Sequence, residues 1–96
     1  MLEVALKECK NRGRAAAEAE QKYRVKVAEK ILELRDQKLP ATLIGDLARG
    51  DKEVSKLKLE RDIAEVVYEN AQEAMLVYRK QIEVLRDQID REWKNA

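Results

Sequence analysis

The sequence predicts an all-α fold, in which two long helices form an antiparallel, coiled-coil-like hairpin with a short helical segment at the hinge. Charged residues make up 41% of the chain and aromatic residues 4%, with no Phe and no His, which is typical of long helices. Large apolar residues recur at three- and four-residue steps. The only proline and every glycine except Gly13 lie between residues 39 and 50. The 96 residues therefore form a single helical-hairpin domain.

The first arm is expected over residues 2–38, because Pro40 disfavours a helical conformation at the residue before it. One narrow apolar stripe follows this arm, with Glu20 as its charged interruption. A polar residue in such a stripe can fix register or oligomeric state, and simple tolerance of the charge is the alternative. The stripe consists of Leu2, Leu6, Cys9, Gly13, Ala16, Tyr23, Val27, Ile31 and Leu34.

The hinge is expected over residues 39–50. Leu43, Ile44 and Leu47 can share one face of a short helix and close the end of the hairpin. Gly50 follows the last apolar residue and is predicted to end this helix in a left-handed conformation.

The second arm is expected over residues 51–94, with Asp51 capping its first amides. Its main stripe has the 3-4 spacing of a coiled coil and is expected to face the first arm. The stripe consists of Leu57, Ala64, Val67, Tyr68, Ala71, Met75, Tyr78, Ile82, Leu85, Ile89 and Trp93.

A second apolar row runs beside this stripe. It widens the uncharged sector of the helix to roughly 200°, about twice what one packed helix covers. The sequence therefore predicts a homo-oligomer, a dimer or tetramer, most simply a two-fold dimer that forms a four-helix bundle. A lone hairpin that tolerates exposed valines is the alternative. The predicted oligomer interface consists of Leu59, Ile63, Val66, Val77 and Val84, with Asn70, Gln81 and Gln88 in the same sector.

The pairing of the arms is expected to place the small-residue run 14–19 opposite Ala71, Ala74 and Met75. Facing residue numbers would then add to about 90. Trp93 would project beyond the first arm, either capping the oligomer core or contacting another protein, since aromatic anchors concentrate interface energy.

No catalytic, metal or cofactor site is predicted. His is absent, and the single cysteine, Cys9, cannot form an intrachain disulfide and is expected to be a structural, buried thiol. Residues 85–90 (LRDQID) are similar to a signature of all-helical chorismate mutases, but there the motif opens the chain and here no helices follow it. We therefore expect a protein that is not an enzyme.

A modest basic patch is the feature that favours nucleic-acid binding. The net charge is only +1, which argues against a dedicated duplex binder. Charge complementarity between the two antiparallel arms is the alternative interpretation of the same residues, and the sequence favours it. The candidate nucleic-acid contacts are Lys7, Lys10, Arg14, Arg79 and Lys80.

No run of about 18 apolar residues exists, and the first residues (MLEVALKECK) mix acidic and basic charges. We therefore expect a cytoplasmic protein with no membrane partner.

Two stretches, residues 39–54 (LPATLIGDLARGDKEV) and 57–75 (LKLERDIAEVVYENAQEAM), resemble small uncharacterised proteins carried by phages and prophages of Gram-positive bacteria. The resemblance implies a phage accessory protein in the host cytoplasm, near replication or recombination functions. Together with the apolar rows, it favours a non-catalytic, self-associating interaction protein that contacts a host or phage protein. An accessory nucleic-acid-binding protein is the alternative.

Overall fold

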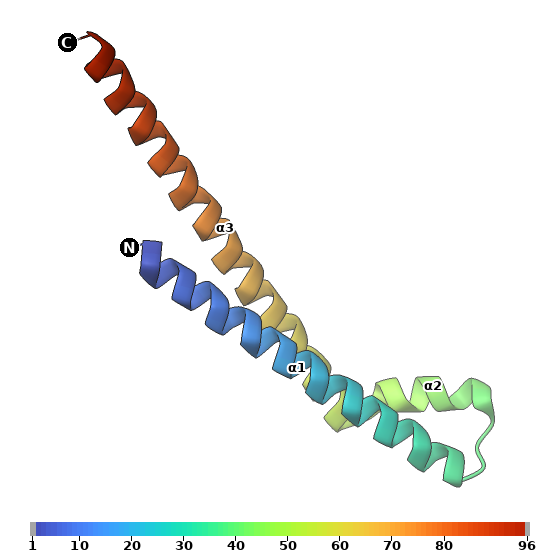
Figure 1. Ribbon diagram of the computed structural model, residues 1–96. Helices are drawn as coiled ribbons and strands as arrows, with labels where there is room; N and C mark the ends of the chain where they lie inside the picture. The colour runs from blue at the N-terminus through green and yellow to red at the C-terminus, as the bar shows by residue number, and fades with distance from the viewer. Residues whose placement is uncertain (1, 96) are drawn as a thin grey trace.

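The computed structural model describes residues 2–95 and contains three helices in that range, α1 (Leu2–Asp36), α2 (Ala41–Gly50) and α3 (Lys52–Asn95). Helices α1 and α3 run side by side in opposite directions, and α2 lies across the end where the chain reverses (Figure 1). The predicted all-α hairpin with a helical hinge is therefore confirmed. Helix α1 ends at Asp36, two residues before the expected end of the first arm, and α3 ends at Asn95, one residue after the expected end of the second arm.

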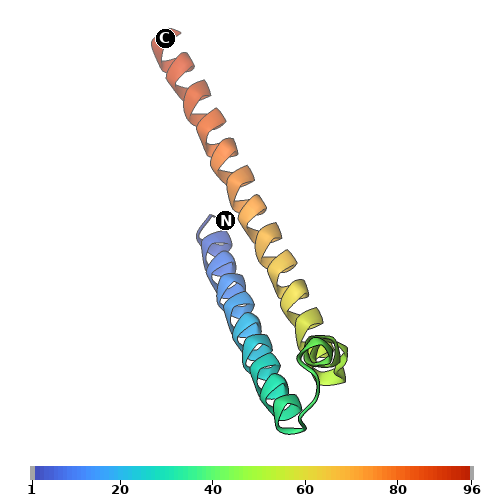
Figure 2. The ribbon, with the colours of Figure 1, turned by 90° about the vertical axis from the view of Figure 1, so that its right-hand side faces the viewer.

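The molecule is strongly elongated. Its principal extents are 81 × 22 × 15 Å and its radius of gyration is 22.4 Å, whereas a compact domain of this length has a radius of gyration of about 12–13 Å. The last part of α3 runs on beyond the start of α1 with no helix beside it (Figure 2). We call this segment, residues 83–95, in which every residue is exposed, the α3 tail. It is about 20 Å long at 1.5 Å per residue.

The register of the two long helices differs from the expected one. Lys30 lies opposite Asp51, and Glu20 lies opposite Arg61, pairs whose residue numbers add to 81 rather than 90. The difference of nine residues is roughly 13 Å along α3. Ion pairs between the helices are made in this register. The apolar spacing alone did not reveal the register, because a stripe with 3-4 spacing packs equally well after a shift of a few turns.

The small-residue run is shifted accordingly. Gly13 lies against the Tyr68 ring, where a Cβ added to the glycine would come within 3.1 Å of Cε1. Ala16 is buried next to this contact, and Ala15 lines a groove with Ala64. The predicted pairing of residues 14–19 with residues 71–75 is therefore wrong. The small residues Gly13 and Ala16 instead leave room for the Tyr68 ring to pack against α1.

The chain leaves α1 through a left-handed residue, but that residue is Lys38 and not Gly50. Lys38 has φ 59°, and its amide donates to the Arg35 carbonyl at 2.9 Å. No glycine has a positive φ, and the chain leaves α2 through extended backbone at Asp51. The predicted left-handed conformation of Gly50 is therefore wrong. Gly50 is the last helical residue of α2, and the extended conformation of Asp51 separates α2 from α3, which begins at the next residue.

Helix α2 covers the hinge end of the hairpin. The largest buried side chains there are Leu34 of α1 and Val54 of α3, and Ala48 of α2 is buried with them. Ile44 is half-buried, but Leu43 and Leu47 remain about half exposed. Of the three residues expected to close the hinge, only Ile44 does so, because the α2 face that packs inward is centred nearer to Ala48.

Candidate interaction surface

The five residues predicted to form an oligomer interface lie exposed along one face of α3. Each of them exposes between 54% and 60% of its surface, so the hairpin leaves this row uncovered. Shallow apolar grooves run along it: one is lined by Ile63 and Val66, another by Val77 and Val84. We call the row the outer seam; it consists of Leu59, Ile63, Val66, Asn70, Ala74, Val77, Gln81, Val84 and Gln88.

The outer seam lies on the side of α3 away from α1. Val54 is buried, and Leu57, Arg61, Ala64 and Tyr68 are half-buried; these five occur at three- and four-residue steps and mark the face that contacts α1. At about 100° per residue, the seam lies roughly 150° around the helix from that face. A single hairpin therefore cannot cover both faces of α3.

A polar network crosses between the arms at Glu20. The Arg61 Nε lies 3.5 Å from one Glu20 carboxylate oxygen, and the Arg24 Nε donates to the other at 2.7 Å. The Arg61 guanidinium carbon also lies 4.5 Å from the centre of the Tyr23 ring, in cation–π geometry. The carboxylate of Asp62, which accepts a hydrogen bond from Arg61, raises the pKa of that guanidinium, with Glu20 and Glu65 adding to the effect.

Glu20 thus lies at a contact between the two arms, and its control of the helix register stays a prediction. Sequence reasoning identified Glu20 but missed Arg61. The available signal was position, since Arg61 lies between Leu57 and Ala64 at the spacing of the main stripe.

A second polar cluster fixes the hinge end. The Asp51 carboxylate accepts hydrogen bonds from the backbone amides of Glu53 at 3.1 Å and Val54 at 3.2 Å, which confirms the predicted cap of α3. The Val54 amide is the main cause that lowers the pKa of Asp51, and the Lys30 ammonium, 3.3 Å away, lowers it further. Lys26 pairs with Glu53 at 2.6 Å, and this hydrogen bond raises the lysine pKa.

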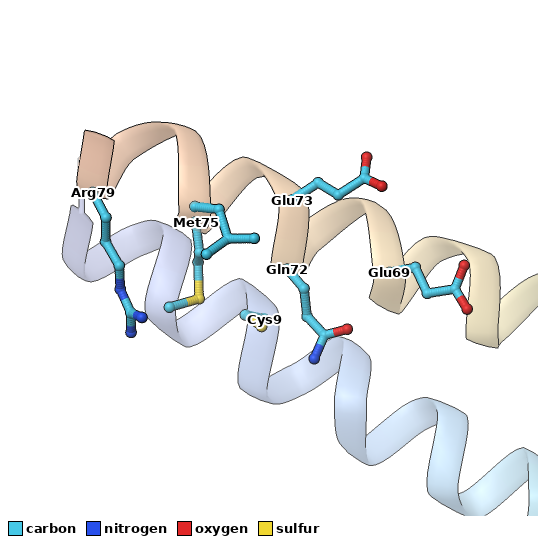
Figure 3. Close-up of a pocket in the computed structure, with 7 residues that line it drawn as sticks. Cys9, Glu69, Gln72, Glu73, Met75 and Arg79 are labelled. Carbon is cyan, nitrogen blue, oxygen red and sulfur yellow. The ribbon is translucent and has the colours of Figure 1, made fainter. Parts of the chain in front are cut away.

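An open groove of about 530 Å³ surrounds Cys9, and Figure 3 shows its lining side chains. The side chains of Met75 and Arg79 extend from α3 towards α1, and Glu69 and Glu73 point away from Cys9 (Figure 3). Cys9 itself is half-buried. Within residues 2–95, no group of three or more His, Cys, Asp or Glu side chains is arranged to hold a metal ion.

The five candidate nucleic-acid contacts do not gather on one surface. Lys7, Lys10 and Arg14 are exposed on α1. Arg79 lines the groove at Cys9, whereas Lys80 lines the groove of the outer seam next to Val77. In the observed register, residues 7–14 of α1 lie level with about residues 67–74 of α3. Arg79 and Lys80 therefore lie further towards the C-terminal end of α3 than the three basic residues of α1.

Trp93 exposes 84% of its surface and is the most exposed large apolar residue of the chain segment that the structure describes. It belongs to the α3 tail, where Leu85 and Ile89 continue the main stripe and are exposed. Figure 1 shows this segment extending alone towards the C-terminus.

Among residues 2–95, no helix combines the length and the apolar character needed to cross a membrane.

Comparison with known proteins identified no matching family model, no matching curated protein and no matching solved structure. The resemblance of residues 39–54 and 57–75 to phage and prophage proteins therefore stays a prediction.

Proposed function

We propose that this protein is a non-catalytic helical interaction protein that self-associates through the outer seam of α3. The observation that carries the proposal is the exposure of the seam valines, leucine and isoleucine along a helix whose opposite face already packs on α1. A contiguous apolar strip on a soluble protein normally marks an interaction surface. Its length, from Leu59 to Gln88, is about 44 Å at 1.5 Å per residue.

The exposed area supports a second copy as the occupant. The chain exposes 8111 Å², whereas a folded monomer of 11.1 kDa exposes roughly 5,700 Å². A stable interface removes about 800 Å² from each partner, which is well within this difference. Within residues 2–95, only Ala16, Leu34, Ala48 and Val54 are buried hydrophobic residues, so the single hairpin has almost no core of its own. Small domains with so little core commonly complete it by oligomerisation.

The test is the solution mass, measured by light scattering coupled to size exclusion over a range of protein concentrations. We expect a mass of twice 11.1 kDa or a larger multiple at micromolar concentration, falling on dilution. A mass of 11.1 kDa at every concentration would refute self-association.

The accessory role in phage replication or recombination is the context that we propose for this interaction, on the strength of the sequence resemblance alone. The nucleic-acid alternative is less well supported, because its five basic residues are divided among separate surfaces. It would require binding that weakens steeply with salt and weakens further in Lys10→Glu/Arg14→Glu.

A further inference from the structure

The outer seam contains three polar residues, Asn70, Gln81 and Gln88, and Asn70 is the one nearest to its middle. Ile63, Asn70, Val77 and Val84 recur every seven residues, and all four are exposed. Positions seven residues apart follow one line of contact between two coiled helices. β-branched residues on that line favour two-stranded coils, and a single asparagine there fixes alignment and oligomeric state at some cost in stability.

The two edges of the seam carry different charge. Asp62, Glu69 and Glu73 lie along one edge, followed by Lys80 and Asp87. The other edge, nearer to α1, carries Val67 and Tyr78 over the same span. The seam therefore has one acidic edge and one largely uncharged edge.

This asymmetry discriminates between the two orientations of a symmetric helix pair. When two copies of a helix pack antiparallel, each edge meets the same edge of the other copy. Centred on the seam, that pairing would place Asp62 near Asp87 of the second copy and Glu73 near its own equivalent, and like charges at such positions are destabilising. It would also place Glu69 near Lys80 of the second copy, but the two symmetry-related contacts of this kind are outnumbered by the three like-charge contacts. A parallel pair instead places the acidic edge of each copy beside the uncharged edge of the other.

The asparagine leads to the same orientation. In the antiparallel pair centred on the seam, Asn70 would face Val77 of the second copy. Its buried amide would lose its hydrogen bonds to water, which costs about 1–3 kcal/mol when no partner replaces them. In a parallel, in-register pair, Asn70 faces its own equivalent, and one amide can donate to the other.

We propose that two copies pair through the outer seam in parallel and in register, with Asn70 beside the second copy's Asn70 as the residue that sets orientation and alignment. This inference rests on the proposed self-association. The two α1 helices then lie on the outside of the pair, and the two α3 tails leave at the same end. The resulting dimer presents two copies of Trp93 at one end rather than one at each end.

Cysteine crosslinking tests the orientation. In a Cys9→Ser background, which removes the only native cysteine, Ile63→Cys and Val84→Cys are prepared as two separate proteins. In a parallel, in-register pair each protein forms a disulfide-linked dimer alone under mild oxidation. In an antiparallel pair the equivalent cysteines are roughly 32 Å apart at 1.5 Å per residue, so neither protein crosslinks alone and only their mixture does. Leu76→Cys, equally exposed on the same helix but outside the seam, is the matched control and is expected not to crosslink.

The same proteins also distinguish self-association through the outer seam from the parallel orientation of the two copies, because the mass of each protein is measured under reducing conditions as well. Reduced dimers with crosslinking of each single variant support the parallel pair. Reduced dimers in which only the mixture crosslinks, or in which nothing crosslinks, overturn the orientation and leave self-association standing. Reduced monomers overturn both.

Asn70→Val tests the residue itself. With Asn70 present, we expect disulfides between identical positions to exceed those between positions 63 and 84 by more than about tenfold in the mixture. With Asn70→Val, we expect this preference to fall several-fold while the reduced mass stays dimeric or increases, because only the charge difference between the two edges then favours the parallel pair. An unchanged preference in Asn70→Val would show that Asn70 does not set the orientation.

Discussion

Replacing Val66 and Val77 with glutamate is expected to dissociate the oligomer. Each valine exposes 54% of its surface in the hairpin, so about half of the side chain remains to be buried on association. Full burial of a valine stabilises by about 1.5–3 kcal/mol, so half of it contributes about 1 kcal/mol. Two copies of two valines then contribute about 4 kcal/mol, which is roughly a thousandfold in Kd. Desolvation of the introduced carboxylates adds to this loss.

Light scattering over a concentration series measures the change, and circular dichroism measures whether the helices remain. A dimer with micromolar Kd would acquire a millimolar Kd and elute with the 11.1 kDa mass of one chain. Helicity should be retained, because both positions are exposed in the hairpin and glutamate is a better helix former than valine.

The matched control is the double variant Leu32→Glu/Leu76→Glu. Leu32 and Leu76 are as exposed as the two valines, but they lie outside the outer seam. This variant carries the same added charge and should keep the mass of the unmodified protein. If the seam variant stayed oligomeric, or if both variants dissociated equally, the assignment of the interface to the outer seam would be wrong.

Further expectations concern the packing within the hairpin and the tail. Gly13→Val should lower the free energy of unfolding by about 1–3 kcal/mol, because the valine side chain would overlap the Tyr68 ring. Gly13→Ala should leave the free energy of unfolding nearly unchanged in denaturant titrations, because alanine gains roughly 0.5–1 kcal/mol of helix propensity, which offsets its closer contact with the ring. Lys38→Gly should raise the free energy of unfolding by about 1 kcal/mol, because glycine adopts the left-handed conformation without strain, and an unchanged denaturation midpoint would contradict this. Because the pKa of Asp51 is lowered in the folded state, its contribution to stability is complete above the ordinary value of 3.8 and is lost as the pH falls through the lower, folded-state pKa. Asp51→Asn can cap the helix without titrating, so this variant should lose less stability on acidification than the unmodified protein. Thermal melts from pH 6 to about pH 2 measure the difference. Trp93 fluorescence should be quenched by iodide as strongly as that of a free tryptophan derivative in the dimer as well as in the monomer, and protection on dimerisation would show that the tail takes part in the interface.

Sequence reasoning identified the helices and the exposed row but not the way the arms align. The hairpin followed from the position of Pro40 and the apolar spacing, and the Asp51 cap followed from a side chain that bonds its own neighbouring amides. These are local features, because each depends on residues a few positions apart. The row at Leu59 to Val84 was likewise visible, since a 3.6-residue period specifies which residues share a face.

The register, the left-handed turn and the role of Arg61 are not local. The register depends on which charged residue meets which across the two arms, and Glu20 could have paired with several cations of α3. Arg61 was assigned to no role because an arginine in an apolar stripe is ordinarily placed in solvent, whereas here its stem packs between the helices and its guanidinium reaches Glu20 and Tyr23. Lys38 carries the positive φ because the path of the chain into α2 requires it there.

The α3 tail retains its helical form without a neighbouring helix, and this makes its folding partly conditional. Isolated helices shorter than about 12–15 residues are marginal in water, and the tail has about this length. Its amides should therefore exchange with solvent faster towards Asn95, in a gradient that begins level with the first residues of α1. Any partner that binds Trp93 must then also stabilise the helical conformation of the α3 tail that carries it. Affinity for that partner could consequently be increased by raising helix propensity away from the apolar stripe, for example with Asp90→Ala, without altering a single contact residue.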